Sequence, residues 1–270
     1  MITVLGASGF IGSHLVKRLR ALGLEHWAPA RNETLARKNL GDVIYCIGLT
    51  SDFRSRPFDA AESHVCKLLE VLRNCEFDSL LYLSSTRLYG THLQEGKEQC
   101  VLQCNPSQRD DLYNISKALG EALCLALDGR GRVVRLSNVY GADVASDNFL
   151  PSIIRDALAG KVITLNTTTD SAKDYIGLDD VIDNLIKIAT SGQQNLYNLA
   201  SGTNTSNRQI MDKICLLTGC RMQVAPDAVT MIYPIINIAR MRGEFGLQPG
   251  QLLDNLERLV ETFRRQRRPD

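Results

Sequence analysis

Tyr113 and Lys117 form the residue pair with the clearest capacity for proton transfer. Four positions separate them in the segment Tyr-Asn-Ile-Ser-Lys, so a helix there would carry both side chains on one face. A phenol with a reference pKa of about 10 is a poor acid or base at pH 7, but a neighbouring ammonium stabilises the phenolate and lowers that pKa. The pair predicts a general acid/base, and Lys117 can also hold the ribose of a cofactor.

Hydroxyl side chains follow the apolar run 80–83, which we expect to be a strand. Ser85 would then lie at the carboxyl end of a parallel sheet, where open α/β sheets bind ligands. Its hydroxyl can donate a hydrogen bond to a carbonyl or alkoxide oxygen while Tyr113 moves the proton. We assign Ser85, its neighbour Thr86 and Tyr113 to the substrate.

Three glycines follow the first apolar run in Gly-Ala-Ser-Gly-Phe-Ile-Gly. Gly6 permits a sharp turn, Gly9 lets backbone amides approach a pyrophosphate, and Gly12 allows close packing of helix on strand. The N-terminus of the following helix presents unpaired N–H groups and a partial positive charge. This segment predicts a dinucleotide site.

The residue after the second expected strand bears on the choice of cofactor. An acidic residue there would bind the ribose 2′-hydroxyl and select NAD, but the run 26–30 is followed by Arg31. A guanidinium can pair with a 2′-phosphate, which favours NADP. Glu33 lies close enough to keep NAD open, and Arg31 can also be a surface residue beside a cofactor whose identity is set elsewhere.

The elements needed to position these residues alternate along the chain, which predicts an α/β fold with a Rossmann-type, doubly wound parallel sheet. We place a dinucleotide-binding domain at 1–142 and a smaller C-terminal α/β substrate lobe at 143–270, with the chain crossing back to the larger core. Strands are expected at 2–6, 26–30, 42–47, 79–83, 132–136 and 194–198, and helices at 10–22, 60–73, 113–127, 149–159 and 251–265.

Four ordered motifs carry a resemblance to a known family. They are Gly6-x-x-Gly9-x-x-Gly12, Ser84-Ser85-x-x-x-Tyr89-Gly90, Tyr113-x-x-x-Lys117 and Arg135-x-x-Asn138-Val139-Tyr140-Gly141. In this order the chain resembles the extended short-chain dehydrogenases/reductases, the NAD-dependent epimerase/dehydratase family. The resemblance implies that Ser85, Tyr113 and Lys117 form a catalytic triad. It also implies that Phe10, Ile11, Gly48 and Leu49 line the cofactor, that Ser137 lies near the nicotinamide, and that Asn138 faces a nucleotide-linked sugar.

The resemblance continues in the segments 173–181 and 197–202, although with departures. Lys173 stands where the family often has Arg, and we expect Asp179 to cap the next helix. About ten residues separate Arg31 from the run 42–47, so the family's third strand and its acidic adenine loop are missing. Thr86 and Arg87 replace the Asp-Glu pair of the 4,6-dehydratases, so that activity is not expected.

These observations favour a reductase that transfers hydride to a keto carbon of a nucleotide-linked sugar while Tyr113 protonates the oxygen. The alternative is an epimerase that holds NAD tightly, oxidises one ring hydroxyl and returns the hydride to the other face. A third hypothesis is a protein of the same fold that binds the cofactor as a sensor and catalyses no reaction.

Composition restricts the partners. With 31 basic and 30 acidic residues the net charge is +1, which gives no electrostatic case for nucleic acid or an anionic membrane. No apolar stretch approaches the roughly 20 residues of a membrane span, so we expect a soluble, cytoplasmic protein. The eight cysteines form no C-x-x-C pair and are expected to be reduced and structural, with no metal site. The resemblance favours a homodimer through the helices at 60–73 and 113–127.

Overall fold

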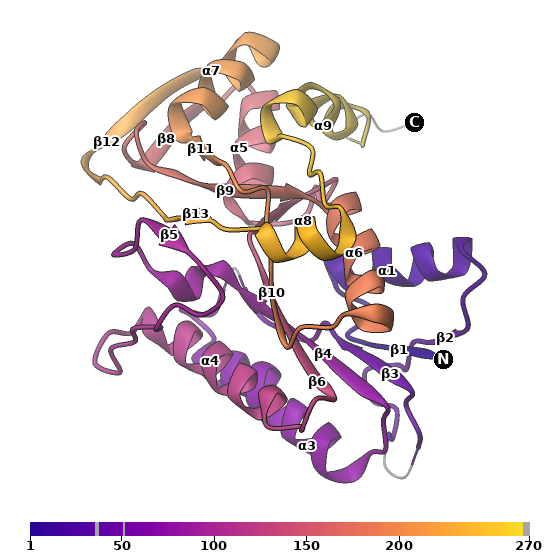
Figure 1. Cartoon of the computed structure of the whole chain (residues 1–270). Helices are drawn as coiled ribbons and strands as arrows, with labels where there is room; N and C mark the ends of the chain where they lie inside the picture. The colour runs from indigo at the N-terminus through magenta and orange to yellow at the C-terminus, as the bar shows by residue number, and fades with distance from the viewer. Residues whose placement is uncertain (36–37, 51, 267–270) are drawn as a thin grey trace.

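The computed structural model describes residues 1–35, 38–50 and 52–266, and its main feature is a six-stranded parallel sheet (Figure 1). The strand order β10-β6-β4-β3-β1-β2 confirms the doubly wound α/β fold. The strands are β1 (Ile2–Leu5), β2 (His26–Trp27), β3 (Asp42–Tyr45), β4 (Ser79–Ser85), β6 (Gly131–Leu136) and β10 (Leu196–Leu199).

Helices cover both faces of this sheet because its central strands are apolar on both sides. Leu81 and Leu83 pack in one buried cluster with side chains of α1 (Phe10–Ala21) and α6 (Leu178–Ser191). The alternate residues Leu80 and Tyr82 pack in a second cluster with α3 (Lys67–Asn74) and α4 (Asp111–Leu125). Figure 1 shows α3 and α4 together on the side opposite α6.

A smaller lobe lies above the carboxyl ends of the strands (Figure 1). Its apolar cluster is formed mainly by three helices around a two-stranded parallel sheet. A capping box at Ser206 and Gln209 begins one of these helices, with each side chain bonded to the other residue's backbone N–H. The elements are α5 (Phe149–Leu158), α7 (Asn207–Thr218), α9 (Leu252–Gln266), β8 (Val162–Thr167) and β12 (Arg221–Val229).

The chain passes between the two lobes more than once. A mixed sheet of order β11-β9-β7 stands between them. After β9 the chain returns to the large sheet through α6 and β10, and then comes back to the mixed sheet as β11. The division of domains at residue 142 stays a prediction. The linking strands are β7 (Asn138–Tyr140), β9 (Ala172–Gly177) and β11 (Asn204–Ser206), beside a short parallel pair of β5 (Glu95–Gly96) and β13 (Ile235–Ile236), with α8 (Ala239–Phe245) following.

Two expected elements differ from the structure. The strand predicted at 26–30 ends at Trp27, and Pro29, which has no N–H to donate, follows two residues later. Within the described residues β2 is the edge of the sheet, as the short spacing before 42–47 predicts. The helix predicted at 60–73 is interrupted, because a π-helical turn at Glu62–Cys66 separates α2 (Pro57–Ala61) from α3.

Smaller predictions are corrected as well. Asp179 does not cap α6, whose N-cap is Gly177, but lies in its first turn, where a carboxylate favours the helix dipole. The cysteines are free, but Cys66 and Cys104 are exposed, so they are not core residues. Within the described part, no helix is long and apolar enough to cross a membrane.

Candidate active site

One row of residues on α4 fixes this helix against β4. Gly120 gives the closest approach, because a Cβ at that position would lie 2.3 Å from the Tyr82 hydroxyl. Lys117 donates from Nζ to the Leu83 carbonyl at 2.8 Å, and Glu121 accepts from the Ser84 hydroxyl at 2.5 Å. Tyr113 begins the row, so the sheet determines where its hydroxyl lies.

Tyr113 is 5 % exposed and lies beside Ser85, as predicted. Burial raises the pKa of the phenol, whereas the hydrogen bond with the Ser85 side chain and the positive charge of Arg87 lower it; the net direction is upward. The Phe53 ring centroid is 5.1 Å from that of Tyr113. Tyr113 is therefore a buried, protonated phenol, as a proton donor requires.

Lys117 departs from its expected electrostatic role. It is 4 % exposed, and burial lowers the pKa of its ammonium to about 7 although Glu121 opposes this. Its Nζ points to the Leu83 carbonyl and lies 4.9 Å from the Tyr82 ring centroid. The cation that lowers the pKa of Tyr113 in this structure is Arg87, whose Cζ is 5.6 Å from the Tyr113 ring centroid.

His64 joins the site although no motif identified it. Its Nε2 accepts from the Leu49 N–H at 3.2 Å, so its proton is on Nδ1, which donates to the Ser116 hydroxyl at 2.8 Å. Ser116 donates in turn to the Tyr113 carbonyl at 2.9 Å. The His64 and Tyr113 ring centroids are 5.3 Å apart. Burial, and then the charge of Lys117, lower the pKa of His64 to about 3, so it is neutral.

The π-helical turn explains how His64 reaches this place. The Tyr45 hydroxyl donates to the Ser63 carbonyl at 2.7 Å, and the Tyr82 hydroxyl to the His64 carbonyl at 3.2 Å. These bonds from β3 and β4 satisfy carbonyls in a turn that widens the helix. A Cβ at Gly48 would lie 3.5 Å from His64 Nε2 and 3.4 Å from Lys117 Nζ, so Gly48 borders both side chains.

The glycine turn has the backbone geometry of a phosphate cradle. Gly6 has φ +86°, and a Cβ at Gly12 would lie 2.3 Å from the Gly6 carbonyl oxygen. Gly9 is the N-cap of α1 with no side-chain cap, so the first-turn amides have no side-chain partner. Phe10 and Ile11 follow on the helix, and the Phe10 ring packs beside Gly141. A pyrophosphate fits these features.

The residues expected at the adenosine end are exposed. Arg31 lies in a turn after β2. Glu33 accepts from the Ala30 N–H at 3.2 Å and pairs with Lys38 at 3.0 Å, and both contacts lower its pKa. Lys38 Nζ also lies 4.4 Å from the centre of the Trp27 ring. Two cations therefore lie near this end, with Glu33 engaged by one of them.

A small cavity of about 150 Å³ opens at the carboxyl end of β4. Ser137 is of interest, because it is 8 % exposed and its hydroxyl has no hydrogen-bond partner in the structure. Asn138 is exposed and donates from Nδ2 to the Asp174 carbonyl at 2.8 Å. The lining is Ser85, Thr86, Arg87, Ser137, Asn138, Lys173, Asp174, Tyr233, Pro234 and Ile236, so the predicted substrate residues other than Tyr113 line one cavity.

A larger hollow of about 380 Å³ adjoins it, since Lys173 and Tyr233 line both. Lys173 is half-buried, and burial together with the charge of Arg87 lowers the pKa of its ammonium to about 8. Its Nζ lies 5.0 Å from the Phe149 ring centroid and 5.4 Å from that of Tyr175. The two hollows form a path from Ser85 to the smaller lobe with a cation on its wall.

Asp174 fixes one wall of this path. The buried carboxylate accepts hydrogen bonds of 2.7 to 3.1 Å from the Ser201 N–H and hydroxyl and from the N–H groups of Gly202 and Thr203. Two of the segments quoted for the resemblance are thus joined. Because its oxygens are occupied, Asp174 provides structure and not a free charge.

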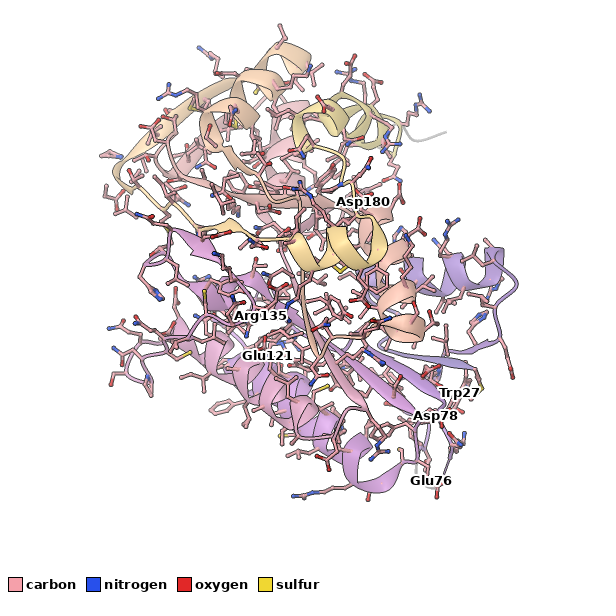
Figure 2. The ribbon with its side chains drawn as sticks, viewed as in Figure 1. Trp27, Glu76, Asp78, Glu121, Arg135 and Asp180 are labelled. Carbon is pink, nitrogen blue, oxygen red and sulfur yellow. The ribbon has the colours of Figure 1, made fainter. Side chains whose placement is uncertain are left out.

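A buried ion pair connects two of the elements that carry the site (Figure 2). Arg135 donates from Nε and Nη2 to Glu121 at 2.9 and 2.7 Å, and the two side chains are 4 % and 5 % exposed. Arg135 also donates to the Tyr89 hydroxyl at 3.0 Å, which donates to Asn198 at 2.7 Å. The network connects α4, β4, β6 and β10.

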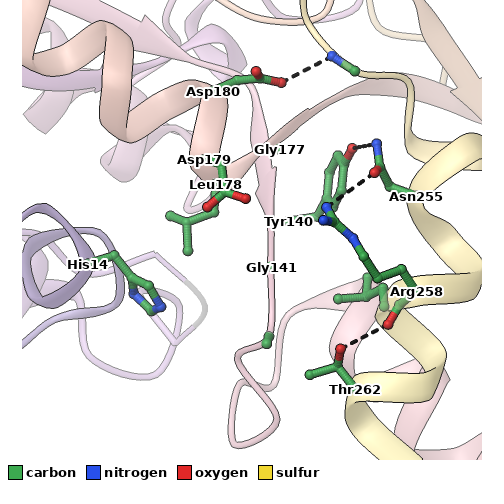
Figure 3. A pocket seen from close by; sticks show the side chains of 13 residues that line it. His14, Tyr140, Gly141, Gly177, Leu178, Asp179, Asp180, Asn255, Arg258 and Thr262 are labelled. Carbon is green, nitrogen blue, oxygen red and sulfur yellow. Dashed lines mark hydrogen bonds between the residues drawn. The ribbon is translucent and has the colours of Figure 1, made fainter. Parts of the chain in front are cut away.

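Another hollow, of about 430 Å³, lies elsewhere, between α1, α6 and α9 (Figure 3). His14, Asp179 and Arg258 line it, whereas Ser85, Tyr113 and Lys117 do not. The Asn255 amide there donates to the Tyr140 hydroxyl at 3.1 Å. Proximity to the acid/base residues makes the smaller cavity the candidate active site.

Comparisons with known proteins agree with this geometry. The sequence profile of the NAD dependent epimerase/dehydratase family matches residues 2–64 and 55–200. The chain is 22% identical to a dTDP-4-dehydro-6-deoxy-D-allose reductase of Streptomyces sp over an alignment of 316 positions, gaps included, which covers 99% of this chain and 97% of that protein. Relatives of comparable identity, 21% to 26%, include proteins named UDP-glucose 4-epimerase, dTDP-glucose 4,6-dehydratase and UDP-glucuronic acid decarboxylase.

Solved structures share the fold. MoeE5 in complex with UDP-glucose and NAD has a TM-score of 0.82 at 20% identity, with 98% of this chain and 99% of that chain covered. RMD from Pseudomonas aeruginosa complexed with NADPH has a TM-score of 0.78 at 20% identity, with 98% of each chain covered. The neighbours thus carry either form of the nicotinamide cofactor.

Proposed function

Because this chain belongs to the NAD dependent epimerase/dehydratase family, we propose that it reduces a keto carbon of a nucleotide-linked sugar with NADPH. The observation that carries this proposal is the meeting of Ser85 and the buried, protonated Tyr113 beside the cavity at the end of β4.

The residues present fit a dinucleotide. The glycine turn offers uncapped first-turn amides to a pyrophosphate, and Gly48 and Leu49 continue the same edge of the sheet towards Lys117. The unpaired hydroxyl of Ser137 faces a cavity where a polar group can satisfy it. When bound, the reduced nicotinamide would supply the hydride.

In the proposed mechanism Ser85 orients the carbonyl oxygen of the sugar, and Tyr113 gives its proton to that oxygen as negative charge develops there. Lys117 holds the cofactor ribose, and the guanidinium of Arg87 supplies positive charge near the resulting phenolate. Asn138 and Lys173 hold the nucleotide part of the substrate, and the half-buried ammonium of Lys173 suits a diphosphate.

The adenosine end favours NADP and release of the cofactor in each cycle. Arg31 and Lys38 can neutralise a 2′-phosphate, and Glu33 already pairs with Lys38. The sheet ends at the two-residue β2 within the described part of the chain, so the structure offers little surface to enclose adenine. An epimerase that keeps its cofactor needs a firmer hold than this.

The test is to titrate the protein with NADPH and NADH, and then to follow the absorbance of the reduced nicotinamide with a panel of keto nucleotide sugars, 4-keto-6-deoxy sugars included. Substrate-dependent oxidation of NADPH is the expected result. If purified protein already contains NAD and interconverts nucleotide sugars without net oxidation, the reductase proposal is wrong and the chain is an epimerase.

We also propose a homodimer through α4 and the helix pair α2 and α3. Leu119 on α4 is 47 % exposed and Phe58 on α2 is 86 % exposed, so both present apolar surface. Sedimentation of the wild type and of a Leu119→Glu variant tests this, since the charge should produce a monomer.

A further inference from the structure

Arg87 occupies an unusual place for a basic residue in the candidate active site. It follows Ser85 by two positions, its backbone N–H donates to the Ser85 hydroxyl at 3.2 Å, and its side chain lines the small cavity. The guanidinium Cζ lies 4.9 Å from the Phe53 ring centroid and 5.6 Å from that of Tyr113. The charge therefore lies beside the phenol that is placed to transfer the proton.

No carboxylate of the described residues hydrogen-bonds this guanidinium. Asp110 is nearest, at 3.9 Å from Nη2, but its oxygens accept the fork of Arg54 at 2.7 and 2.6 Å on the rim. Asp174, the carboxylate of the cavity lining, is occupied by backbone and hydroxyl donors of the segment 201–203. The guanidinium of Arg87 therefore has a long ion pair with Asp110 but no hydrogen-bonded anion among the described residues, and its N–H groups can bind one from a ligand.

A second observation also points to a ligand in this cavity. The hydroxyl of Ser137 is buried and has no partner, although a buried polar group usually finds one. It lines the same cavity as Arg87. A ligand group with several oxygens would satisfy both residues.

We propose that Arg87 binds a carboxylate carried by the sugar ring on the carbon next to the reacting carbon, so that the substrate is a nucleotide-linked uronic acid or its keto form. This inference rests on the proposed function and specifies its substrate class. The oxygen that reacts must lie within hydrogen-bonding distance of Tyr113 and Ser85. A substituent carbon two bonds from the reacting carbon lies only about 2.5 Å from it, which keeps its carboxylate beside Tyr113 and within reach of Arg87.

The phosphates of the nucleotide are a different source of negative charge, but another cation is placed for them. Lys173 lines both the small cavity and the larger hollow towards the smaller lobe. The planar fork of an arginine can match a carboxylate or a phosphate, so position decides: Lys173 also lines the hollow towards the smaller lobe, whereas Arg87 lies beside Tyr113 at the reacting end. The two cations thus divide the substrate between them.

The experiment measures equilibrium binding by the full chain loaded with nicotinamide cofactor. Two matched pairs serve as probes, UDP-glucose with UDP-glucuronic acid and GDP-mannose with GDP-mannuronic acid. The variants are Arg87→Gln and Arg87→Lys, with Arg56→Gln as a matched control, because Arg56 pairs with Asp52 and Asp59 and does not line the cavity. Thermal unfolding verifies that each variant is folded.

In the wild type we expect the acidic member of a pair to bind on the order of ten- to a hundredfold more tightly than the neutral one. Arg87→Gln should remove that preference by weakening the acid alone, and Arg87→Lys should retain part of it. Equal affinity for both members in the wild type, or an equal loss of both in Arg87→Gln, would overturn the assignment of Arg87. Failure of the wild type to bind any of the four would instead contradict the proposed function.

Discussion

His64 should make the stability of this protein depend on pH between pH 7 and pH 5. Burial lowers the pKa of this imidazole from 6.5 to about 3, so the unfolded chain takes up its proton first as the pH falls. Stability therefore rises with pH over this interval: the contribution of His64 is fully present above the unfolded pKa of 6.5 and is lost as the pH falls from there towards 3. At pH 7 the loss is only about 0.2 kcal/mol, and at pH 5 it is about 2 kcal/mol.

The geometry explains why the folded protein resists this proton. Nε2 of His64 already accepts the Leu49 N–H, so protonation there would break that hydrogen bond. It would also place a second buried positive charge near Lys117, whose charge lowers the pKa of His64 further. Both effects act at His64, which connects the loop expected to line the cofactor with the first turn of α4, where Tyr113 lies.

Urea unfolding at pH 7, 6 and 5 measures the effect in the wild type, in His64→Gln and in His92→Gln. His92 is exposed, so its replacement is the matched control. The His64→Gln variant can be less stable at every pH, but the drop in its free energy of unfolding from pH 7 to pH 5 should be smaller than that of the wild type by about 2 kcal/mol. If wild type and His64→Gln lose the same free energy over this interval, the assignment of a depressed pKa to His64 is wrong.

Four further changes probe other parts of the structure. Tyr113→Phe should lower kcat by about 10²- to 10⁴-fold with nearly unchanged NADPH binding, which titration of the cofactor would verify; full activity would refute its acid role. Arg31→Ala should weaken NADPH by about tenfold and leave NADH unaffected in the same titration, and an equal effect on both would remove the argument for NADP. Glu121→Gln should cost about 3–5 kcal/mol in urea unfolding because Arg135 is left buried without its partner, and a loss below about 1 kcal/mol would contradict that placement. Gly120→Ala should displace α4 from Tyr82 and reduce kcat more than cofactor affinity, whereas normal kinetics would show that this contact does not set the position of Tyr113.

The parts of the fold that could be predicted depend on local pattern. The glycine turn and the strands at 42–47 and 79–83 combine short-range spacing with apolar runs, and the structure has them nearly where expected. The strand predicted at 26–30 ends early because, among the described residues, only β1 pairs with it, and this pairing stops at Trp27. The local sequence specifies which secondary structure a segment can form, but the neighbouring strand determines how far that strand extends.

The candidate site also contains residues that the sequence predicts and residues that it does not. Tyr113 and Ser85 could be paired in advance because a helix face and a strand end fix their directions. His64 could not be identified, since a single histidine in an amphipathic helix gives no signal, and its burial depends on a π-helical turn held by Tyr45 and Tyr82 from other strands. Arg87 was visible as a departure from the family pattern, but its distance from Tyr113 depends on how α4 packs on β4.

The charges around the site bear on the charge of the substrate. Lys117, Arg87 and Lys173 bring three basic side chains to the path from the cofactor side to the smaller lobe, while the buried acids nearby, Glu121 and Asp174, already accept hydrogen bonds from the protein. Burial lowers the pKa of both lysines, so each gains stability when an anion arrives. A neutral substrate would leave this charge unmatched. The site therefore favours a substrate that brings its own negative charges. Binding of the nucleotide phosphates beside Lys173 should raise the pKa of its ammonium.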